Sequence, residues 1–284
     1  MLTPVRDPEL AAAEAAASAG VEVRELTSAA EAGEAARLHA RIWRVPPEAA
    51  PVGKDALRAL AATGNYVAGA YAGETMVGAA VAFLAGPRPL ELHSHVTGIV
   101  DGTQGRGVGY ALKLHQRAWA LARDIGTVTW TVDPLLRRNV FFNLAKLGAE
   151  VRAYLPDHYG AMDDGVNAGD ESDRLALAWP LASARVAAAC AGTPHAVSTA
   201  GAAPLLRAGP DGAPALDLAA GAEAAVTCAV PVDAVALRAA DPAAALAWRR
   251  ALREALGGAL AAGYRVAGFT RDGEYLLVRE EEER

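Results

Sequence analysis

The chain has 284 residues, of which 52% are hydrophobic, and its formal net charge is −6. A chain of this length buries a sizeable core, whereas its acidic balance lacks the sequence-independent attraction on which nucleic-acid binding depends. Cys190 and Cys228 are the only cysteines. They are too few for a disulfide framework or a four-cysteine zinc site, and they favour a reducing, cytoplasmic setting.

The first part of the chain predicts a helical tail followed by alternating strands and helices. Residues 1–20 are rich in Ala and do not resemble a signal peptide, and no run of 18 apolar residues suggests a membrane span. Ser28 and Glu31 form a capping box at the start of a helix. The predicted strands are 21–26, 66–71 and 76–84, the last two joined as a hairpin, and the predicted helices are 28–43 and 54–63.

A glycine-rich loop at 104–109 is the most informative segment. It follows a predicted strand at 90–100 and opens a helical pattern at 110–125, after which a strand at 127–132 and a helix at 136–147 are predicted. Glycine lacks a Cβ, so backbone N–H groups can approach a ligand closely, and the start of a helix favours phosphate. A loop that only turns the chain is the simpler alternative.

A dinucleotide-binding unit is a second alternative for this loop. That fold has Gly-x-Gly-x-x-Gly directly after its first strand and an acidic residue roughly 20 residues later, a place that Asp133 could take. Here, however, the third glycine comes one position early. Nearly a hundred residues also precede the unit, so this alternative is disfavoured.

Gln104-Gly105-Arg106-Gly107-Val108-Gly109 resembles the acyl-CoA pyrophosphate loop of the GNAT N-acyltransferase superfamily, whose defined positions match at Gln104, Gly107 and Gly109. Residues 139–148 resemble a later helix of that superfamily, and the resemblance extends over 21–181. Residues 156–160 and 172–174 are similar to a group of predicted acetyltransferases with relatives among amino-acid N-succinyltransferases.

This resemblance implies an α/β fold with a mixed, splayed central sheet flanked by helices, and an acyl-CoA-dependent N-acyltransferase. Acetyl-CoA or succinyl-CoA would be the co-substrate without a metal, and a small-molecule amine such as an amino acid would be the acceptor. Neither a nucleic acid nor a membrane is expected as a partner. A non-catalytic acyl-CoA-binding module is the alternative function. The expected donor-binding residues are Gly98, Ile99, Val100, Gln104, Gly105, Arg106, Gly107, Val108, Gly109, Tyr110, Asn139 and Asn143.

The strand before the loop carries candidate catalytic side chains. Glu91, His93, His95 and Thr97 share one face if the strand keeps its period of two. Histidine is the natural general base near neutral pH, so at least one of the first three is expected to deprotonate the amine. The alternatives are an ordinary packed or exposed face, or a zinc site, for which no third partner is visible. The superfamily holds the thioester between this strand and the next, where the backbone N–H groups of 98–100 would stabilise the oxyanion.

The expected general acid departs from the family pattern. Many relatives carry a Tyr four residues before the glycine that ends the later helix, and this chain has Leu144 there. Tyr159 is the preferred replacement because it lies in a loop where site residues often gather; an ordinary half-buried tyrosine is the alternative. Arg174 is the preferred arginine for a carboxylate of the substrate, with Arg137 and Arg138 as further candidates or as surface charges.

Three domains are predicted: a helical tail (1–20), the acyl-CoA-binding domain (21–181), and a smaller C-terminal α/β domain (182–284). The last contains a predicted strand at 224–232, a helix that begins after Asp241, and a hairpin at 264–279. It shows no catalytic constellation. We expect it to shield the first domain or to form a homodimer contact, with 280–283 as a solvated acidic tail.

Overall fold

The computed structural model describes residues 7–86, 89–167 and 169–279. The predicted acidic tail and the first six residues of the predicted N-terminal tail lie outside this part. Contacts divide the described chain into two compact units. Unit 1 comprises the residues up to Trp130 together with Asp164–Val166 and Pro180–Ser183, and unit 2 comprises Thr131–Asp163, Asn167–Trp179 and the residues from Ala184 onward. The predicted domain boundary between residues 181 and 182 stays a prediction.

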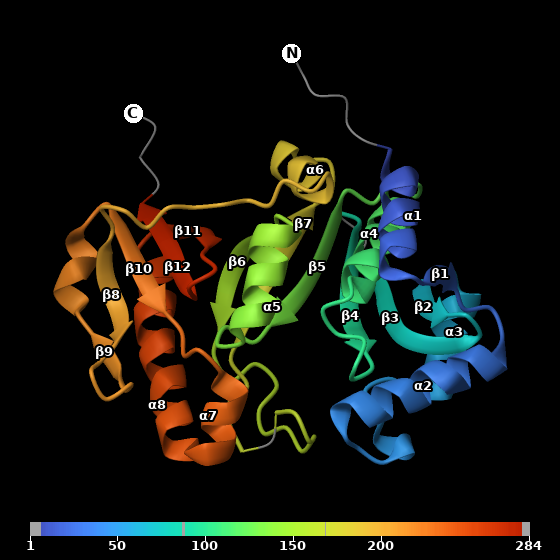
Figure 1. The fold of residues 1–284 in the computed structure, drawn as a ribbon, viewed down its shortest axis with the longest axis horizontal. Helices are drawn as coiled ribbons and strands as arrows, with labels where there is room; N and C mark the ends of the chain where they lie inside the picture. Colours follow the sequence, from blue (N-terminus) through green and yellow to red (C-terminus); the bar gives the residue numbers. More distant parts are fainter. Residues whose placement is uncertain (1–6, 87–88, 168, 280–284) are drawn as a thin grey trace. The chain divides into compact units, whose positions relative to one another are not determined.

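The helices of unit 1 begin at recognisable caps. The Asp7 side chain accepts a hydrogen bond from the Glu9 N–H (2.9 Å) at the start of the first helix, and Ser28 and Glu31 form the predicted capping box at the second. The first helix packs along the fourth, as the blue and green ribbons of Figure 1 show. These elements are α1 (Pro8–Ala19), α2 (Ala29–Trp43), the 3₁₀ turn η1 (Pro47–Ala49), α3 (Lys54–Ala62) and α4 (Val108–Leu121).

The sheet of unit 1 follows the order of the chain. Its strands are β1 (Glu22–Glu25), β2 (Tyr66–Ala72), β3 (Thr75–Ala85), β4 (Glu91–Ile99) and β5 (Thr127–Val132), hydrogen-bonded in that sequence. The first four pair antiparallel, and β4 pairs parallel with β5 after the crossover through α4. One hydrophobic core joins α2 and α3 to this sheet.

Two irregularities of β4 shape the region that precedes the glycine loop. Val96 pairs with Val81 and Ser94 pairs with Ala82, so His95 is an extra residue on β4, a β-bulge. With β5, the described pairing covers Glu91, Leu92 and His93. Residues 94–99 therefore continue along β3 without a described partner on β5, which is the predicted splay of the central sheet.

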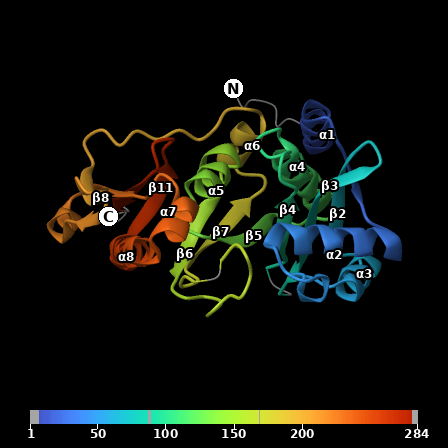
Figure 2. The ribbon, with the colours of Figure 1, turned by 60° about the horizontal axis from the view of Figure 1, so that its bottom comes forward.

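Unit 2 contains the end of β5, a helix that turns into a π-helix, an antiparallel pair of strands and a second sheet in the order β11-β12-β10-β8-β9. Figure 2 shows these elements from the side of α7 and α8. Their bounds are α5 (Arg137–Phe141), η2 (Phe142–Lys146), β6 (Glu150–Leu155), β7 (Arg174–Pro180), α6 (Ala184–Cys190), β8 (Ala203–Ala208), β9 (Pro214–Leu216), η3 (Leu218–Ala222), β10 (Ala225–Ala229), α7 (Ala234–Ala240), α8 (Pro242–Leu252), η4 (Arg253–Gly257), α9 (Gly258–Ala261), β11 (Tyr264–Phe269) and β12 (Glu274–Arg279).

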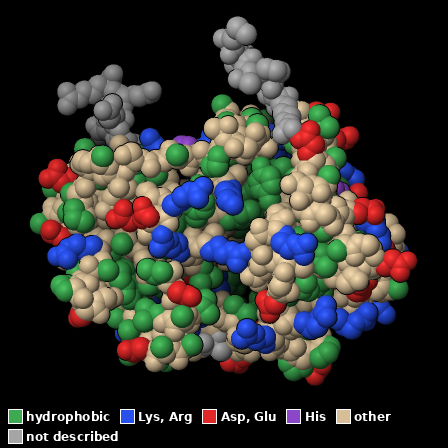
Figure 3. All heavy atoms as spheres, in the orientation of Figure 1, with side chains coloured by type: hydrophobic (Ala, Val, Ile, Leu, Met, Phe, Trp, Pro, Cys, Tyr) green, Lys and Arg blue, Asp and Glu red, His purple; other side chains and the backbone are tan. Residues whose placement is uncertain are grey.

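The mixed α/β class, the splayed central sheet and a second sheet in the C-terminal region are confirmed. Within the described ranges, no helix is both long enough and apolar enough to cross a membrane. Cys190 and Cys228 are free thiols, and both are buried in unit 2. On the face drawn in Figure 3, basic and acidic side chains are interspersed with hydrophobic ones, so this face carries mixed charge.

Candidate active site

The glycine loop lies at the start of α4 and its backbone requires glycine. Gly105 and Gly107 have φ values of +83° and +92°, in the left-handed region that L side chains rarely adopt. Gly107 is the N-cap of α4 and supplies no side-chain cap, so the first N–H groups of the helix keep their capacity to bind an anion. Residues 104–107 are exposed. The loop therefore has the conformation and the accessibility of a phosphate site.

Gly109 has a different reason to be glycine. A Cβ at this position would lie 2.8 Å from the Cδ1 of Ile99, which is closer than packed atoms approach. The small residue thus lets the first turn of α4 pack on the end of β4. Its predicted role in donor binding stays a prediction, and this packing alone explains the residue.

His93 and His95 lie together on β4, beside Phe83 of β3. The ring centroids of His93 and His95 are 5.3 and 5.6 Å from that of Phe83 and 6.2 Å from each other. The Nδ1 of His93 is 3.4 Å from the Oγ1 of Thr129. His95, the bulged residue, is exposed, and partial burial lowers its pKa from the usual 6.5. Glu91 is half-buried and lies on the same face as His93 by strand alternation.

The prediction that Thr97 shares this face is wrong, because the bulge changes the alternation. The Oγ of Ser94 accepts a hydrogen bond from Lys113 of α4, whereas the α-carbon of Gly98 faces α2. Residues four apart on a regular strand would face the same side. The alternation is therefore interrupted between Ser94 and Gly98. Beyond the bulge, Ile99 lies against Gly109 of α4, and Thr97, two residues before it, faces α4 as well.

Gly98 is held close by α2. A Cβ there would lie 2.7 Å from Ile42, 2.9 Å from Trp43 and 3.3 Å from His39. His39 is fully buried, its Nε2 is 3.3 Å from the Ala79 carbonyl oxygen, and burial lowers its pKa to about 4. The expected close approach to this glycine therefore comes from α2, and His39 is neutral at pH 7.

Tyr159 and Arg174 come together in unit 2. The Tyr159 hydroxyl is 3.0 Å from the Oγ1 of Thr131, and its backbone N–H donates to the Oγ of Ser172 (2.8 Å). The Tyr159 side chain is exposed, whereas Arg174 is buried and its Cζ lies 5.3 Å from the Tyr159 ring centroid. Arg174 donates to the Asp173 carbonyl (2.8 Å), and its Nη2 lies 3.3 Å from the Asn167 Oδ1.

Asn139 and Asn143 lie where α5 passes into the π-helix η2. Asn139 is exposed, while Asn143 is buried and donates from its Nδ2 to the Asn139 carbonyl (2.9 Å). Leu144, which stands where the sequence resemblance implied a tyrosine, is 1% exposed and belongs to the core. Arg137 donates to the Arg271 carbonyl in the turn between β11 and β12. π-Helical segments are frequent at functional sites.

Lys113 is a buried residue beside the candidate site whose burial the sequence pattern did not indicate. Lys113, Gln116 and Arg117 are polar residues between the apolar positions of α4, and all three are buried; α1 packs along this helix. The Nζ of Lys113 donates to Ser94 (2.9 Å) and Gln116 (3.0 Å) and lies 3.9 Å from the Trp130 ring centroid. Burial lowers its pKa to about 7.

The place of Lys113 follows from the strand register. The described β4–β5 pairing ends at His93 and Thr129, and Ser94 and Trp130 are the next residues on each strand. The ammonium thus lies at the root of the splay. Only the rarity of lysine, which occurs three times in the chain, could have drawn attention to it.

The candidate residues fall into two groups. His93, His95, Gly98 and the glycine loop belong to unit 1. Tyr159, Arg174, Asn139 and Asn143 belong to unit 2. The contacts given above join His93 to His95 in unit 1, and Tyr159 to Arg174 and Asn143 to Asn139 in unit 2.

No protein-family model matches the chain, and no curated protein matches it. Solved structures that are similar include the ribosomal-protein-S18-alanine N-acetyltransferase from Escherichia coli (15% identity, 58% of this chain and 96% of that chain, TM-score 0.47). A putative acetyltransferase of the GNAT family from Desulfovibrio desulfuricans is 18% identical over 57% of this chain and 99% of its own (TM-score 0.47). A putative acetyltransferase from Salmonella typhimurium with its cofactor acetyl-CoA is 15% identical over 57% and 95% (TM-score 0.46). All three likenesses are distant.

Proposed function

We propose that this chain is an acyl-CoA-dependent N-acyltransferase that acts on the amine of a small molecule. The observation that carries the proposal is the glycine loop at the uncapped start of α4, directly after a strand that separates from its parallel neighbour. The loop offers N–H groups to the pyrophosphate of CoA. We assign the thioester to the part of β4 beyond His93, where the described pairing with β5 has ended.

In the proposed reaction, the amine nitrogen attacks the thioester carbonyl carbon and forms the amide bond. The C–S bond breaks, the ammonium proton passes to a base, and the CoA sulfur leaves as a thiolate that takes a proton. Holding both reactants in one site accounts for much of the acceleration, since well-oriented reactants gain roughly 7–11 kcal/mol.

The backbone of β4 supports oxyanion stabilisation at one position in particular. The Val100 N–H donates to the Val77 carbonyl (3.0 Å) and is committed to the β3 ladder. Because successive N–H groups of a strand point to opposite sides, that of Gly98 also points toward β3 and that of Ile99 points toward the open side of β4. We therefore assign the oxyanion donor to Ile99 and leave Val100 out of that role.

His95 is the proposed general base. It is the bulged residue, it is exposed, and its lowered pKa leaves it neutral and able to accept a proton at pH 7. A His95→Gln change is expected to lower kcat about 10²–10⁴-fold, the usual worth of a general base, without changing the Kd of acetyl-CoA. The wild-type pH profile of kcat/KM should lose activity only below about pH 6.5. An unchanged kcat in His95→Gln would remove His95 from the mechanism.

Tyr159 is the proposed acid and Arg174 the proposed partner of an acceptor carboxylate. Tyr159→Phe should lower kcat and leave donor binding intact, and Arg174→Gln should raise the KM of the acceptor. Succinyl transfer is the finer alternative, in which the guanidinium holds the free carboxylate of the donor. A non-catalytic acyl-CoA-binding module is the second candidate function, because buried Leu144 occupies the place of the family acid.

Calorimetric titration with CoA, acetyl-CoA, succinyl-CoA and NADH tests the proposal, followed by measurement of thiol release with a panel of amines. CoA compounds should bind and NADH should not, and the tighter thioester identifies the donor. Binding of NADH alone would restore the dinucleotide alternative. Binding of CoA without thiol release from any amine would favour the binding module.

A further inference from the structure

Four acidic side chains near Tyr159 and Arg174 are paired with arginines of a single C-terminal helix and the π-helix that continues it. We name residues 156–163 and 169–173 the acceptor loop, because Tyr159 lies in it and Arg174 follows it. Arg249 lies in α8 and Arg253 at the start of η4. Being four residues apart, the two share one helical face. All of these residues belong to unit 2.

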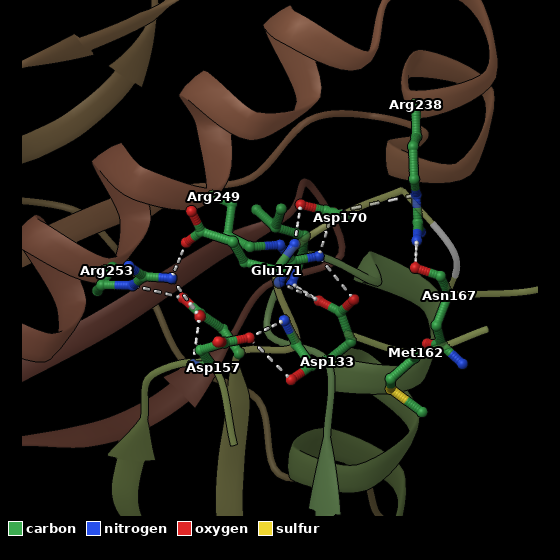
Figure 4. A network of polar contacts seen from close by, with 12 residues as sticks. Asp133, Asp157, Met162, Asn167, Asp170, Glu171, Arg238, Arg249 and Arg253 are labelled. Carbon is green, nitrogen blue, oxygen red and sulfur yellow. Dashed lines mark hydrogen bonds and ion pairs between the residues drawn. The ribbon is translucent and has the colours of Figure 1, made fainter. Parts of the chain in front are cut away.

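Arg249 is the centre of this arrangement. Its side chain is 1% exposed, and its partners Asp133 and Asp170 are 5% and 4% exposed. The guanidinium binds Asp133 through two hydrogen bonds, Nη1 to Oδ1 (3.2 Å) and Nη2 to Oδ2 (2.9 Å). The same Nη2 donates to the Oδ2 of Asp170 (2.7 Å), as Figure 4 shows. One cation thus holds two buried carboxylates from distant parts of the chain.

Arg253 holds the next acidic residues of the loop. It pairs with Asp173, which is 0% exposed, and with Glu171. Asp173 in turn accepts hydrogen bonds from the Tyr154 hydroxyl (2.6 Å) and from the Asp157 N–H (2.9 Å). Burial would raise the pKa of Asp173, but the hydrogen bonds from Arg253, Asp157 and Tyr154 lower it below the ordinary value.

Two of the carboxylates bound by arginine, Asp133 and Asp173, lie within two residues of a group in the candidate site, and Asp157, which donates its N–H to Asp173, does so as well. Asp133 follows Thr131, whose hydroxyl contacts the Tyr159 hydroxyl. Asp157 precedes Tyr159 by two residues and accepts from the N–H and hydroxyl of Ser172 (3.0 and 3.1 Å), which itself holds the Tyr159 N–H. Asp173 precedes Arg174. The arginines therefore hold residues 170–173 directly, and residues 157–159 through the hydrogen bonds to Asp173 and Ser172.

We propose that Arg249 is the positioning residue of the acceptor loop, which it holds by joining Asp133 at the end of β5 to Asp170. The C-terminal segment is then an integral part of the acceptor site. A buried ion pair is weak evidence for stability but is a recognised means of specifying one arrangement, whereas removal of one partner leaves buried charge uncompensated. This inference rests on the proposed function for its catalytic consequence, and on the contacts alone for its structural one.

The positioning role of Arg249 is tested in the full chain by amide hydrogen exchange and by steady-state kinetics. The variants are Arg249→Met and Arg249→Lys, with Arg250→Ala as the control. Arg250 is the next residue of α8 and pairs with Glu171, but its side chain is 63% exposed. In Arg249→Met, amides of 156–163 should exchange at least about tenfold faster, because buried Asp133 loses its arginine and Asp170 keeps only the longer contact with Arg238 (4.0 Å). Arg249→Lys should be intermediate, since an ammonium cannot replace the two-pronged contact, and Arg250→Ala should match the wild type.

The kinetic measurements distinguish a positioning role of Arg249 from a general loss of stability. With acetyl-CoA and the amine that gives the fastest thiol release, Arg249→Met should raise the KM of the amine more than it lowers kcat. The calorimetric Kd of acetyl-CoA should stay within about twofold of wild type, because the donor loop lies in another unit. If Arg249→Met does not fold, Asp170→Asn replaces it, since this change removes one carboxylate charge at constant volume.

Unchanged exchange of 156–163 in Arg249→Met would overturn the positioning role whether or not the protein has acyltransferase activity. Faster exchange with an unchanged KM for the amine would show that this loop does not bind the acceptor, and would overturn the proposal as well. If the wild type releases no thiol with any amine, the proposed function fails, and the exchange comparison still decides whether Arg249 holds the loop.

Discussion

Single glycines of this chain are required for different structural reasons, which the sequence alone does not distinguish. Gly105 and Gly107 need a left-handed backbone, Gly98 and Gly109 need the absence of a Cβ, and Gly126 needs neither. A substitution at each position therefore tests a different property. The loop conformation is tested by the first pair and the packing of β4 by the second.

Gly107→Ala should raise the Kd of CoA about tenfold, because a residue with a Cβ is strained by roughly 1–2 kcal/mol in the left-handed region and distorts the start of α4. Gly126→Ala is the matched control, since its φ is not positive and nothing lies within 4 Å of the added carbon. Calorimetric titration of both variants with CoA measures the difference. Equal affinities would mean that the loop does not hold the pyrophosphate.

The buried Lys113 should make stability depend on pH. Its pKa is about 7 in the folded chain, whereas an unfolded lysine titrates near 10.4. Between these values the unfolded chain binds a proton that the folded chain does not, so the free energy of unfolding rises with pH over that window. Lys113→Met should flatten this rise in urea unfolding measured from pH 6 to pH 9. A slope equal to that of wild type would contradict the assignment.

At the scale of elements, the strand–loop–helix–strand unit around residues 90–132 was predictable because its signals are local. Turn glycines, a capping box and apolar periodicity each depend on residues a few positions apart. The bulge at His95 was not predictable, since it is visible only in the pairing of β4 with β3. Because of the bulge, Thr97 lies on the opposite face of β4 from the one that a period of two predicts.

The capping box of α2 gives a test at this scale. Ser28→Ala should lower the free energy of unfolding by about 1 kcal/mol, the usual contribution of an N-cap.

Glu31, bound by Arg24 and Ser28, has its pKa lowered to about 2. Its contribution is present above pH 4.5 and is lost as the pH falls toward 2. Chemical unfolding at pH 7 and pH 3 measures both effects; Thr27→Ala is a neighbouring control.

At the scale of the whole chain, the sequence pattern separated 182–284 from the rest, while the contacts tie it to residues long before it. Arg249 and Asp133 are 116 positions apart, and the Tyr275 hydroxyl donates to the Pro134 carbonyl (2.7 Å) across 141. No periodicity reports such pairs. The ion network around the acceptor loop was therefore beyond reach from one sequence, as were α7 and the two strands β8 and β9.

In a chain that ends at Leu181, the remaining residues of unit 2 should not unfold in a cooperative transition, whereas unit 1 keeps its own core. The truncation removes Arg249 and Arg253 together with α8, η4 and the whole second sheet, so the part of unit 2 that remains loses both its ion pairs and most of its apolar packing. Differential scanning calorimetry of residues 1–181 beside the full chain provides the measurement. A sharp transition in the shorter chain that includes these residues of unit 2 would support the predicted domain 21–181 as an independent folding unit.

The two cysteines give the molecule a natural reporter of its own motions. Both thiols are buried in unit 2, and burial raises the pKa of Cys228 to about 12, so native protein holds almost no reactive thiolate there. The rest of the chain has none. The rate at which a thiol reagent labels the unmodified protein therefore measures how often unit 2 opens. If CoA slows hydrogen exchange in the glycine loop of unit 1 without slowing the thiol labelling, the opening motions of the two units are independent.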